Sequence, residues 1–352
     1  MRRVFRHVLT DFAPRYLRIH KAFAPRFSGL GSILVLHRVV ARTEGPRIAN
    51  QEELEVSPEF LESLIAFFKD ADYEIVSLDQ VHARLNGEEQ PAQKFVCFTF
   101  DDGYVDAYAT VYPIFKRHGL PFALYVTTSF PDRTAVLWWY LLEDLVRTSD
   151  RVAFSFGGKS YKHPAADGAQ KEAAFDAIAS LITNADESIR EDLLVSIFES
   201  EGMNLYFYSE RLTMDWAQIE DLSKDPLVTI GAHTVNHFAL SRLDEAAVEQ
   251  EVLQAKAAIE RHIGKSVEHF AYPYGNNRAI GGRELKIARR AGFKTCATAI
   301  TANVFKEHAR HLECLPRITI TGGANGLFQT EKLTSGFLPA LTHRFRRVVT
   351  LA

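Results

Sequence analysis

Two short stretches that lie far apart in the sequence carry residue types that bind metal ions. Asp101 and Asp102 stand side by side before Gly103, and His233 and His237 stand four residues apart. Catalytic zinc usually takes three protein ligands from His and Asp or Glu and leaves one position open. It lowers the pKa of a bound water toward about 7, so that a neighbouring carboxylate can take the proton. The two stretches therefore predict a zinc hydrolase, with one Asp as ligand and the other as general base.

Both stretches lie at the ends of apolar segments that we predict as buried strands. Consecutive side chains of a strand point to opposite faces, so adjacent carboxylates share a site only where the strand ends and the chain turns. Gly103 supplies the freedom for that turn. His233 and His237 have the spacing of one face of a helical turn, and we expect them on a loop or short helix. Each motif alone is weak evidence for a metal site, since turns favour Asp and Gly for local reasons and the chain has 13 His.

Five ordered segments of the chain resemble the polysaccharide deacetylase family, which includes the chitooligosaccharide deacetylases. The segments are Ile33–Val39, Phe98–Gly103, His233–His237, Phe270–Gly275 and Leu315–Ile318. The resemblance spans about residues 33–320. It implies a metal-dependent hydrolase that removes N-acetyl groups from amino sugars of a poly- or oligosaccharide and releases acetate.

By this resemblance Asp102, His233 and His237 bind the metal, and Asp101 is the general base. Zn²⁺ is the expected ion, although other divalent transition metals accept the same ligands. Tyr274 matches the position whose backbone N–H helps to hold the developing oxyanion, a contribution typically worth about 3 kcal/mol.

The chain departs from the family pattern in two places. Family members commonly carry an Arg in the third motif that orients the base, and here Ala271 stands at the corresponding place. Many also end with a Leu-x-x-His motif whose His protonates the leaving amine, where this chain has Leu315-Pro316-Arg317-Ile318. We expect Arg317 to take over the orienting role, with a purely structural ion pair as the alternative.

The second departure leaves the general acid open. His37 follows the first predicted strand, and we expect it near the catalytic mouth, either as the acid or as a packing residue. His308 and His311 are weaker candidates, because they lie in a polar stretch that we predict as loop.

Strands that alternate with helices predict a parallel α/β architecture. Eight strands are expected, at residues 33–37, 74–78, 95–100, 122–127, 228–232, 267–272, 294–298 and 315–320. The resemblance implies a distorted (β/α)7-8 TIM-like barrel with a mostly helical insertion. Active sites of such barrels lie at the carboxyl ends of the strands, where all the candidate residues fall.

Residues 129–224 interrupt the strand pattern over a length that exceeds any ordinary connection. We predict an inserted lid or subdomain with a hairpin around Gly157-Gly158 and helices near 169–183 and 187–199. Its aromatic residues Trp138, Trp139 and Tyr140 either stack on sugar rings or pack in a core. The expected division of the chain is 1–30 basic segment, 31–128 and 225–325 barrel, 129–224 insertion, and 326–352 basic tail.

Both ends of the chain are basic and carry interleaved apolar residues. Within 1–27 the basic residues are Arg2, Arg3, Arg6, Arg15, Arg18, Lys21 and Arg26, against the single acid Asp11. Such segments either lie on an anionic membrane surface or pack on the barrel with their charges in water. Peripheral membrane contact would suit a lipid-linked substrate.

Composition bounds the remaining possibilities. The chain has 352 residues, and its net charge of −3 argues against general nucleic-acid binding. Cys97, Cys296 and Cys314 form no metal-binding pattern and are expected as buried thiols in a reducing compartment. No apolar run has the length of a membrane span, and no signal peptide is evident. We therefore expect a cytoplasmic protein, either free or at the inner face of the membrane. The oligomeric state is left open.

Two alternatives to sugar deacetylation stay open. One is an amidohydrolase that acts on a non-sugar amide or a formamide, because a fold does not fix its substrate. The other is a catalytically weak glycan-binding member of the same family. The intact set of Asp101, Asp102, His233 and His237 argues against the second alternative.

Overall fold

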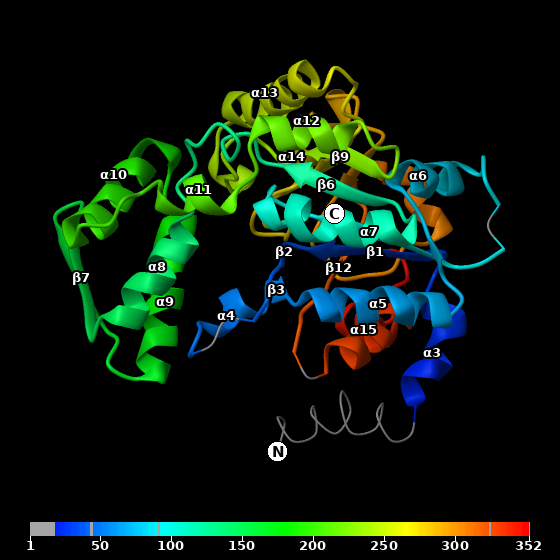
Figure 1. Ribbon diagram of the computed structural model, residues 1–352, viewed down its shortest axis with the longest axis horizontal. Coiled ribbons are helices and arrows are strands. Elements are labelled where there is room, and N and C mark those ends of the chain that lie inside the picture. Colours follow the sequence, from blue (N-terminus) through cyan, green and yellow to red (C-terminus); the bar gives the residue numbers. More distant parts are fainter. Residues whose placement is uncertain (1–17, 43–44, 91, 324, 352) are drawn as a thin grey trace.

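A curled parallel sheet forms the centre of the molecule (Figure 1). The computed structural model describes residues 18–42, 45–90, 92–323 and 325–351. The eight strands of this sheet are β1 (Gly31–Leu36), β4 (Glu74–Ile75), β5 (Phe95–Phe100), β6 (Phe122–Val126), β9 (Val228–Ala232), β10 (His269–Ala271), β11 (Thr295–Ala297) and β12 (Ile318–Thr319). The predicted α/β fold and all eight predicted strands are confirmed, and four of the strands are markedly shorter than expected.

The order of the strands bends the sheet toward a barrel. The hydrogen-bonded path is β11-β10-β9-β6-β5-β1-β12, and β4 pairs with the start of β5. An isolated parallel bridge between Ala297 of β11 and Leu315, just before β12, brings the two ends of this path together. The carboxyl ends of the strands consequently converge on one mouth.

The central strand β5 shows how the sequence selects what faces the barrel interior. Phe95 and Cys97 belong to the interior apolar cluster, whereas Val96 and Phe98 pack in the larger cluster beneath the outer helices. Because the side chains alternate, Asp101 continues the inward-facing row beyond the end of the strand.

Helices cover the outer face of the sheet and close its amino end. Those whose apolar residues join the outer cluster are α5 (Pro58–Asp70), α7 (Tyr112–His118), α12 (Trp216–Ser223), α13 (Glu245–Ile263) and α14 (Gly282–Arg290). Helix α6 (Leu78–Asn86) instead packs on the interior cluster. Shorter elements around the barrel are β2 (Arg38–Val39), α4 (Ala49–Glu52), β3 (Glu55–Val56), η2 (Ala107–Val111), η4 (Leu240–Arg242), η5 (Lys306–Arg310) and η6 (Leu312–Cys314).

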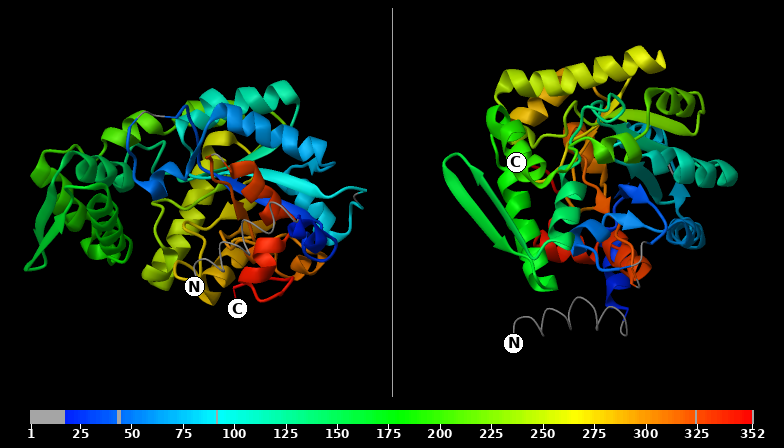
Figure 2. Two further views of the ribbon diagram at one scale, coloured as in Figure 1. Left: turned by 90° about the horizontal axis from the view of Figure 1, so that it is seen from below. Right: turned by 60° about the vertical axis from the view of Figure 1, so that its left-hand side comes forward.

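The insertion between β6 and β9 folds around a core of its own and projects sideways from the barrel (Figures 1 and 2). Its elements are α8 (Trp138–Thr148), β7 (Arg151–Phe156), β8 (Lys159–Pro164), α9 (Gly168–Thr183), α10 (Glu187–Phe198), η3 (Glu199–Glu201) and α11 (Phe207–Leu212). Gly157 and Gly158 both have positive φ, as a two-residue hairpin turn requires, so the predicted hairpin is confirmed. The helices predicted near 169–183 and 187–199 are also present.

The two ends of the described chain pack against each other. Helix α3 (Ile19–Phe27) contacts the C-terminal α16 (Phe337–Thr342), which follows α15 (Gly326–Thr334). The ring centroids of Phe23 and Phe337 lie 5.0 Å apart. The part of the predicted basic segment that precedes position 18, which includes Arg2, Arg3, Arg6 and Arg15, lies outside the described residues. Within the described residues, no helix combines the length and apolarity that a membrane span requires.

Candidate active site

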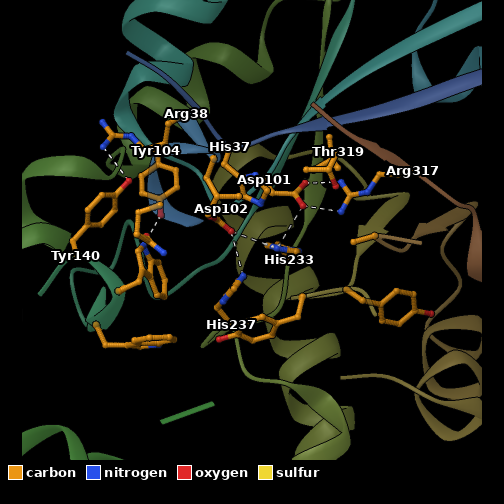
Figure 3. Close-up of a pocket in the computed structure, with 18 residues that line it drawn as sticks. His37, Arg38, Asp101, Asp102, Tyr104, Tyr140, His233, His237, Arg317 and Thr319 are labelled. Atoms are coloured by element: carbon orange, nitrogen blue, oxygen red, sulfur yellow. Dashed lines mark hydrogen bonds and ion pairs between the residues drawn. The ribbon is translucent and has the colours of Figure 1, made fainter. Parts of the chain in front are cut away.

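Strand β5 delivers Asp101 and Asp102 to the mouth of the barrel. Asp102 has a φ of 77° and Gly103 a φ of 98°, so the chain turns as soon as the strand ends. The turn brings both carboxylates to one cavity (Figure 3). The sequence pointed to Gly103 as the source of this freedom. The structure shows that Asp102 itself adopts the left-handed conformation, which is uncommon outside glycine and concentrates at functional sites.

The loop after β9 carries His233 and His237. Thr234 and His237 have φ values of 66° and 55°, so the two His are brought together by an irregular turn. The helical-face interpretation of their spacing is therefore wrong, and the loop alternative holds. The hydroxyl oxygen of Thr234 accepts the backbone N–H of His237 at 3.1 Å and closes the turn.

Glu251 of α13 holds this loop from outside. Its carboxylate accepts the backbone N–H groups of Val235 and Asn236, both at 2.9 Å, and the Asn236 side-chain amide at 2.7 Å. Glu251 was not among the residues predicted from the sequence. Its signal was an acidic residue inside the apolar stripe of a helix, beside the buried Val248 and Val252.

The three predicted metal ligands converge on one point. Asp102 Oδ1 lies 3.5 Å from His233 Nε2 and 3.3 Å from His237 Nε2, and the candidate ligand atoms all lie within 4.8 Å of one another. His233 Nδ1 lies 2.7 Å from the carbonyl oxygen of Ala271. Donation of that N–H fixes the tautomer in which Nε2 offers its lone pair to the site.

The surroundings of Asp102 fit a divalent cation. Within the described part of the chain, its buried Oδ1 has no hydrogen-bond partner, although a buried carboxylate oxygen normally has one. Burial alone would raise the pKa of Asp102, but His237 and His233 hold it below its ordinary value. Burial lowers the pKa of His237 to about 4, so this imidazole is neutral near pH 7 and able to ligate. The donor set is therefore that of a His₂Asp metal site.

Asp101 is held by a guanidinium from the opposite side of the barrel. Arg317, which precedes β12 and is 1% exposed, donates from Nη1 to Oδ1 at 2.6 Å and from Nη2 to Oδ2 at 2.7 Å. Its Nε donates to the carbonyl oxygen of Thr298 at 2.9 Å, which fixes the plane of the fork. Burial raises the pKa of Asp101, but Arg317 outweighs this and keeps the pKa below its usual value. Ala271, at the place of the customary Arg, lies in the interior cluster.

The remaining predicted residues fall into two groups. His37 and Tyr274 line the same cavity as the carboxylates. The ring centroid of Tyr274 lies 5.0 Å from that of His237, and among the described residues the Tyr274 N–H has no hydrogen-bond acceptor. His308 and His311 do not line the cavity. His308 is buried in η5, where its Nδ1 accepts the Phe305 N–H at 2.9 Å, so the predicted loop is a short helix there.

Aromatic residues complete the cavity, whose volume is about 300 Å³. Trp139 and Tyr140 come from the first turn of α8, so the insertion supplies part of the wall. Trp139 Nε1 donates to the hydroxyl of Tyr104 at 3.1 Å. Arg38 donates to Asp106 at 2.9 Å and lies over the ring of Tyr104. Tyr104, Arg38 and Asp106 were not predicted as site residues, because no pattern in the neighbouring sequence marks them as neighbours of α8.

Comparison with known proteins agrees with this barrel and its site. The family model described as polysaccharide deacetylase matches residues 88–191 and 175–296, more than half of the chain. The chain therefore belongs to the polysaccharide deacetylase family.

A curated relative supports the same family over a short stretch. YxkH of Bacillus subtilis (strain 168), whose name assigns it to the polysaccharide deacetylases, is 28% identical over 79 residues. The match covers 22% of this chain and 28% of that relative.

Solved structures share the fold at low identity. The deacetylase PplD of Streptococcus pyogenes, in complex with acetate, has a TM-score of 0.55 at 18% identity, covering 85% of this chain and 97% of that one. IcaB from Ammonifex degensii has a TM-score of 0.54 at 16% identity, covering 86% and 96%. These similarities establish the barrel architecture.

Proposed function

We propose that the protein is a metal-dependent hydrolase that removes N-acetyl groups from amino sugars of a poly- or oligosaccharide and releases acetate. The observation that carries this proposal is the convergence of Asp102, His233 and His237 beside the ion-paired Asp101. Asp102, His233 and His237 would hold the metal, with Zn²⁺ as the expected ion. When bound, such an ion supplies a Lewis acid and lowers the pKa of a coordinated water.

In this proposal, Asp101 is the general base that accepts a proton from the attacking water. Both of its oxygens keep a lone pair beyond the bond to Arg317, so the carboxylate can still accept a proton. Arg317 fixes its orientation and keeps it ionised. The Tyr274 N–H donates to the oxygen that gains charge as the acetamide carbon becomes tetrahedral.

His37 is the proposed general acid for the leaving amine. It lines the cavity and is close enough to lower the pKa values of both Asp101 and Asp102 through its charge. When the C–N bond breaks, the amine nitrogen must gain a proton, and His37 faces the cavity without a hydrogen-bond partner among the described residues (Figure 3).

The assignment of His37 is tested with two substrates. Replacing His37 by Gln should lower acetate release from an N-acetyl sugar by about 100-fold, within the usual range for a general acid. Hydrolysis of phenyl acetate, whose leaving group needs no proton, should change far less. Equal losses on both substrates, or no loss on either, would show that His37 is not the acid.

Substrate class is tested by product analysis. Zinc-loaded protein should release acetate from N-acetylglucosamine oligomers, and removal of the metal by a chelator should stop the release. Release of formate from an N-formyl sugar or of acetate from a simple alkyl acetamide, with none from the oligomers, would favour the amidohydrolase alternative. Oligomer binding without any product would favour the glycan-binding alternative.

We also propose that the packed ends of the described chain contact an anionic membrane surface. Phe345 is 57% exposed and packs against Phe23 and Phe27 of α3. The segments that meet there carry the exposed basic side chains Arg18, Lys21, Arg26, Arg344, Arg346 and Arg347. Such a cluster favours anionic lipid headgroups. Flotation with phosphatidylserine vesicles should recover the protein, and flotation with phosphatidylcholine vesicles should not. Equal recovery, or none with either lipid, would reject membrane contact.

A further inference from the structure

A second cavity, of about 380 Å³, opens between the insertion and the loop that carries His237. It shares Trp138, Trp139 and His237 with the active-site cavity, so the two are neighbours across these side chains. Its far wall is the first part of α10. A substrate group held in this cavity would lie directly beside the candidate metal ligands.

Among the described residues, the one Arg or Lys side chain that lines this second cavity is Arg190 of α10. It is only 8% exposed, and its guanidinium lies 4.7 Å from the ring centroid of Phe238. Among the residues that the structure describes, no carboxylate lies within ion-pair distance of Arg190, and the neighbour that faces its guanidinium is the neutral hydroxyl of Tyr274. Glu187 and Glu191 also line the cavity, but both are exposed to solvent. A buried cation without an anionic partner is costly, so its retention points to an anion supplied from outside.

The charge of Arg190 is felt in the active site. Burial raises the pKa of Tyr274, and Arg190 opposes that rise. Burial is also the main cause of the lowered pKa of His237, to which Arg190 contributes. The hydroxyl of Tyr274 is itself buried without a hydrogen-bond partner among the described residues. Arg190 and Tyr274 therefore face each other at the junction of the two cavities, and among the described residues no anion balances the guanidinium.

We propose that Arg190 forms a subsite for an anionic group, a carboxylate or a phosphate, carried by the substrate next to the amino sugar. The guanidinium is planar and presents paired donors that match both groups. It sits in the first turn of a twelve-residue helix, where the positive end of the helix dipole also favours an anion. This inference rests on the proposed function for the orientation of the sugar, but the binding that it predicts requires no turnover.

Binding of three sugars to the metal-loaded Asp101→Asn variant tests the subsite. The sugars are N-acetylglucosamine 1-phosphate, a disaccharide of N-acetylglucosamine and glucuronic acid, and the neutral N,N′-diacetylchitobiose. At least one acidic sugar should bind about tenfold more tightly than the neutral one, as a charge-assisted bidentate contact allows. That preference should weaken with added salt. The acidic sugar that is preferred identifies the group as phosphate or carboxylate.

Replacement of Arg190 by Gln should remove the preference for the acidic sugar and leave neutral-sugar binding nearly unchanged. The matched control is Arg211→Gln, because Arg211 is another insertion arginine stacked on an aromatic ring, Phe207, but it is exposed and outside the cavity. The control should keep the preference. If Arg190→Gln unfolds the protein, Arg190→Lys should fold and weaken the preference through loss of the bidentate geometry.

Equal binding of all three sugars by the starting protein would overturn the proposal. A preference that survives in both Arg190 variants would do the same and would reduce Arg190 to a packing residue against Phe238. Failure of acetate release would not produce either result, so the subsite and the proposed reaction fail separately.

Discussion

The barrel wall and the insertion wall of the active-site cavity differ in how their polar groups are satisfied. On the barrel wall, Asp101 is paired by Arg317 and the loop of His233 is clamped by Glu251, so charges meet partners from distant strands and helices. On the insertion wall, Trp139 offers a ring, and in the neighbouring second cavity Arg190 of the insertion has no ion-pair partner among the described residues. Under the proposed function, we infer from this difference that the barrel performs the chemistry and that the insertion selects the substrate. Substitutions on the two walls should accordingly affect different kinetic constants.

Removal of a proposed metal ligand on the barrel wall should have the largest effect. Asp102→Asn should abolish tight binding of one equivalent of metal and lower kcat/KM about a thousandfold or more, because Lewis-acid stabilisation is worth several kcal/mol. Metal content and acetate release measured on the same sample check this. His262→Ala is the control, since His262 stacks on Trp216 away from the site and should keep both properties. Full metal content with lost activity would show that Asp102 is not a ligand.

Disruption of the Asp101–Arg317 pair should come next. Arg317→Lys keeps the charge but loses the fork, and we expect a loss of about 30- to 100-fold, the equivalent of about 2–3 kcal/mol for a charge-assisted bidentate contact. The pKa of Asp101 should rise, because the hydrogen bonds from Arg317 are part of what holds it down against burial, together with the charges of Arg317 and His233. A base works only when ionised, so the acidic limb of the pH–rate profile should shift to higher pH. An unshifted limb would mean that Arg317 does not act on the base.

The metal affinity should depend on pH through His233. Burial lowers the pKa of His233, but Asp101 and Asp102 outweigh this and raise it above the ordinary value in the metal-free protein. Ligation requires the neutral imidazole, so below that raised pKa each binding event must release a proton. The apparent affinity should increase about tenfold per pH unit and level off above the pKa. Chelator competition between pH 5.5 and 8.5 measures this, and a flat profile would contradict it.

The insertion wall should give the smallest effect and a different signature. Trp139→Ala should raise KM about five- to thirtyfold and change kcat little, since loss of a stacking aromatic removes roughly 1–2 kcal/mol of binding. Steady-state kinetics on the N-acetyl sugar separate the two constants. A fall in kcat of the same size as the loss from Arg317→Lys would break the proposed division between the walls.

The sequence was informative where the signal is local. The strand positions followed from apolar runs, and the proposed roles of Asp101, Asp102, His233 and His237 followed from motifs at strand ends. Contacts across the barrel were harder to predict from the sequence. Arg317 was expected to orient Asp101 only because the usual Arg was missing at Ala271, whereas the fork geometry depends on how the sheet closes through Leu315.

Contacts between the insertion and the barrel left no local signal. Arg190 lies on a helix whose other charged residues are ordinary solvent-facing positions, and nothing in its neighbourhood marks the burial that packing on Phe238 imposes. The left-handed conformations of Asp102, Thr234 and Tyr274 were equally hidden, because local propensity favours glycine there and the tertiary structure overrides it.

The most direct test of the account measures metal content and acetate release together in the Asp101→Asn variant. Asn is nearly isosteric but cannot serve as a base, so the variant should bind one equivalent of metal while its acetate release falls about 100- to 10,000-fold. That result would separate the base from the ligands, as the geometry of the two neighbouring carboxylates requires. Acetate release near the starting level, with metal bound, would contradict the assignment of Asp101 and the mechanism built on it.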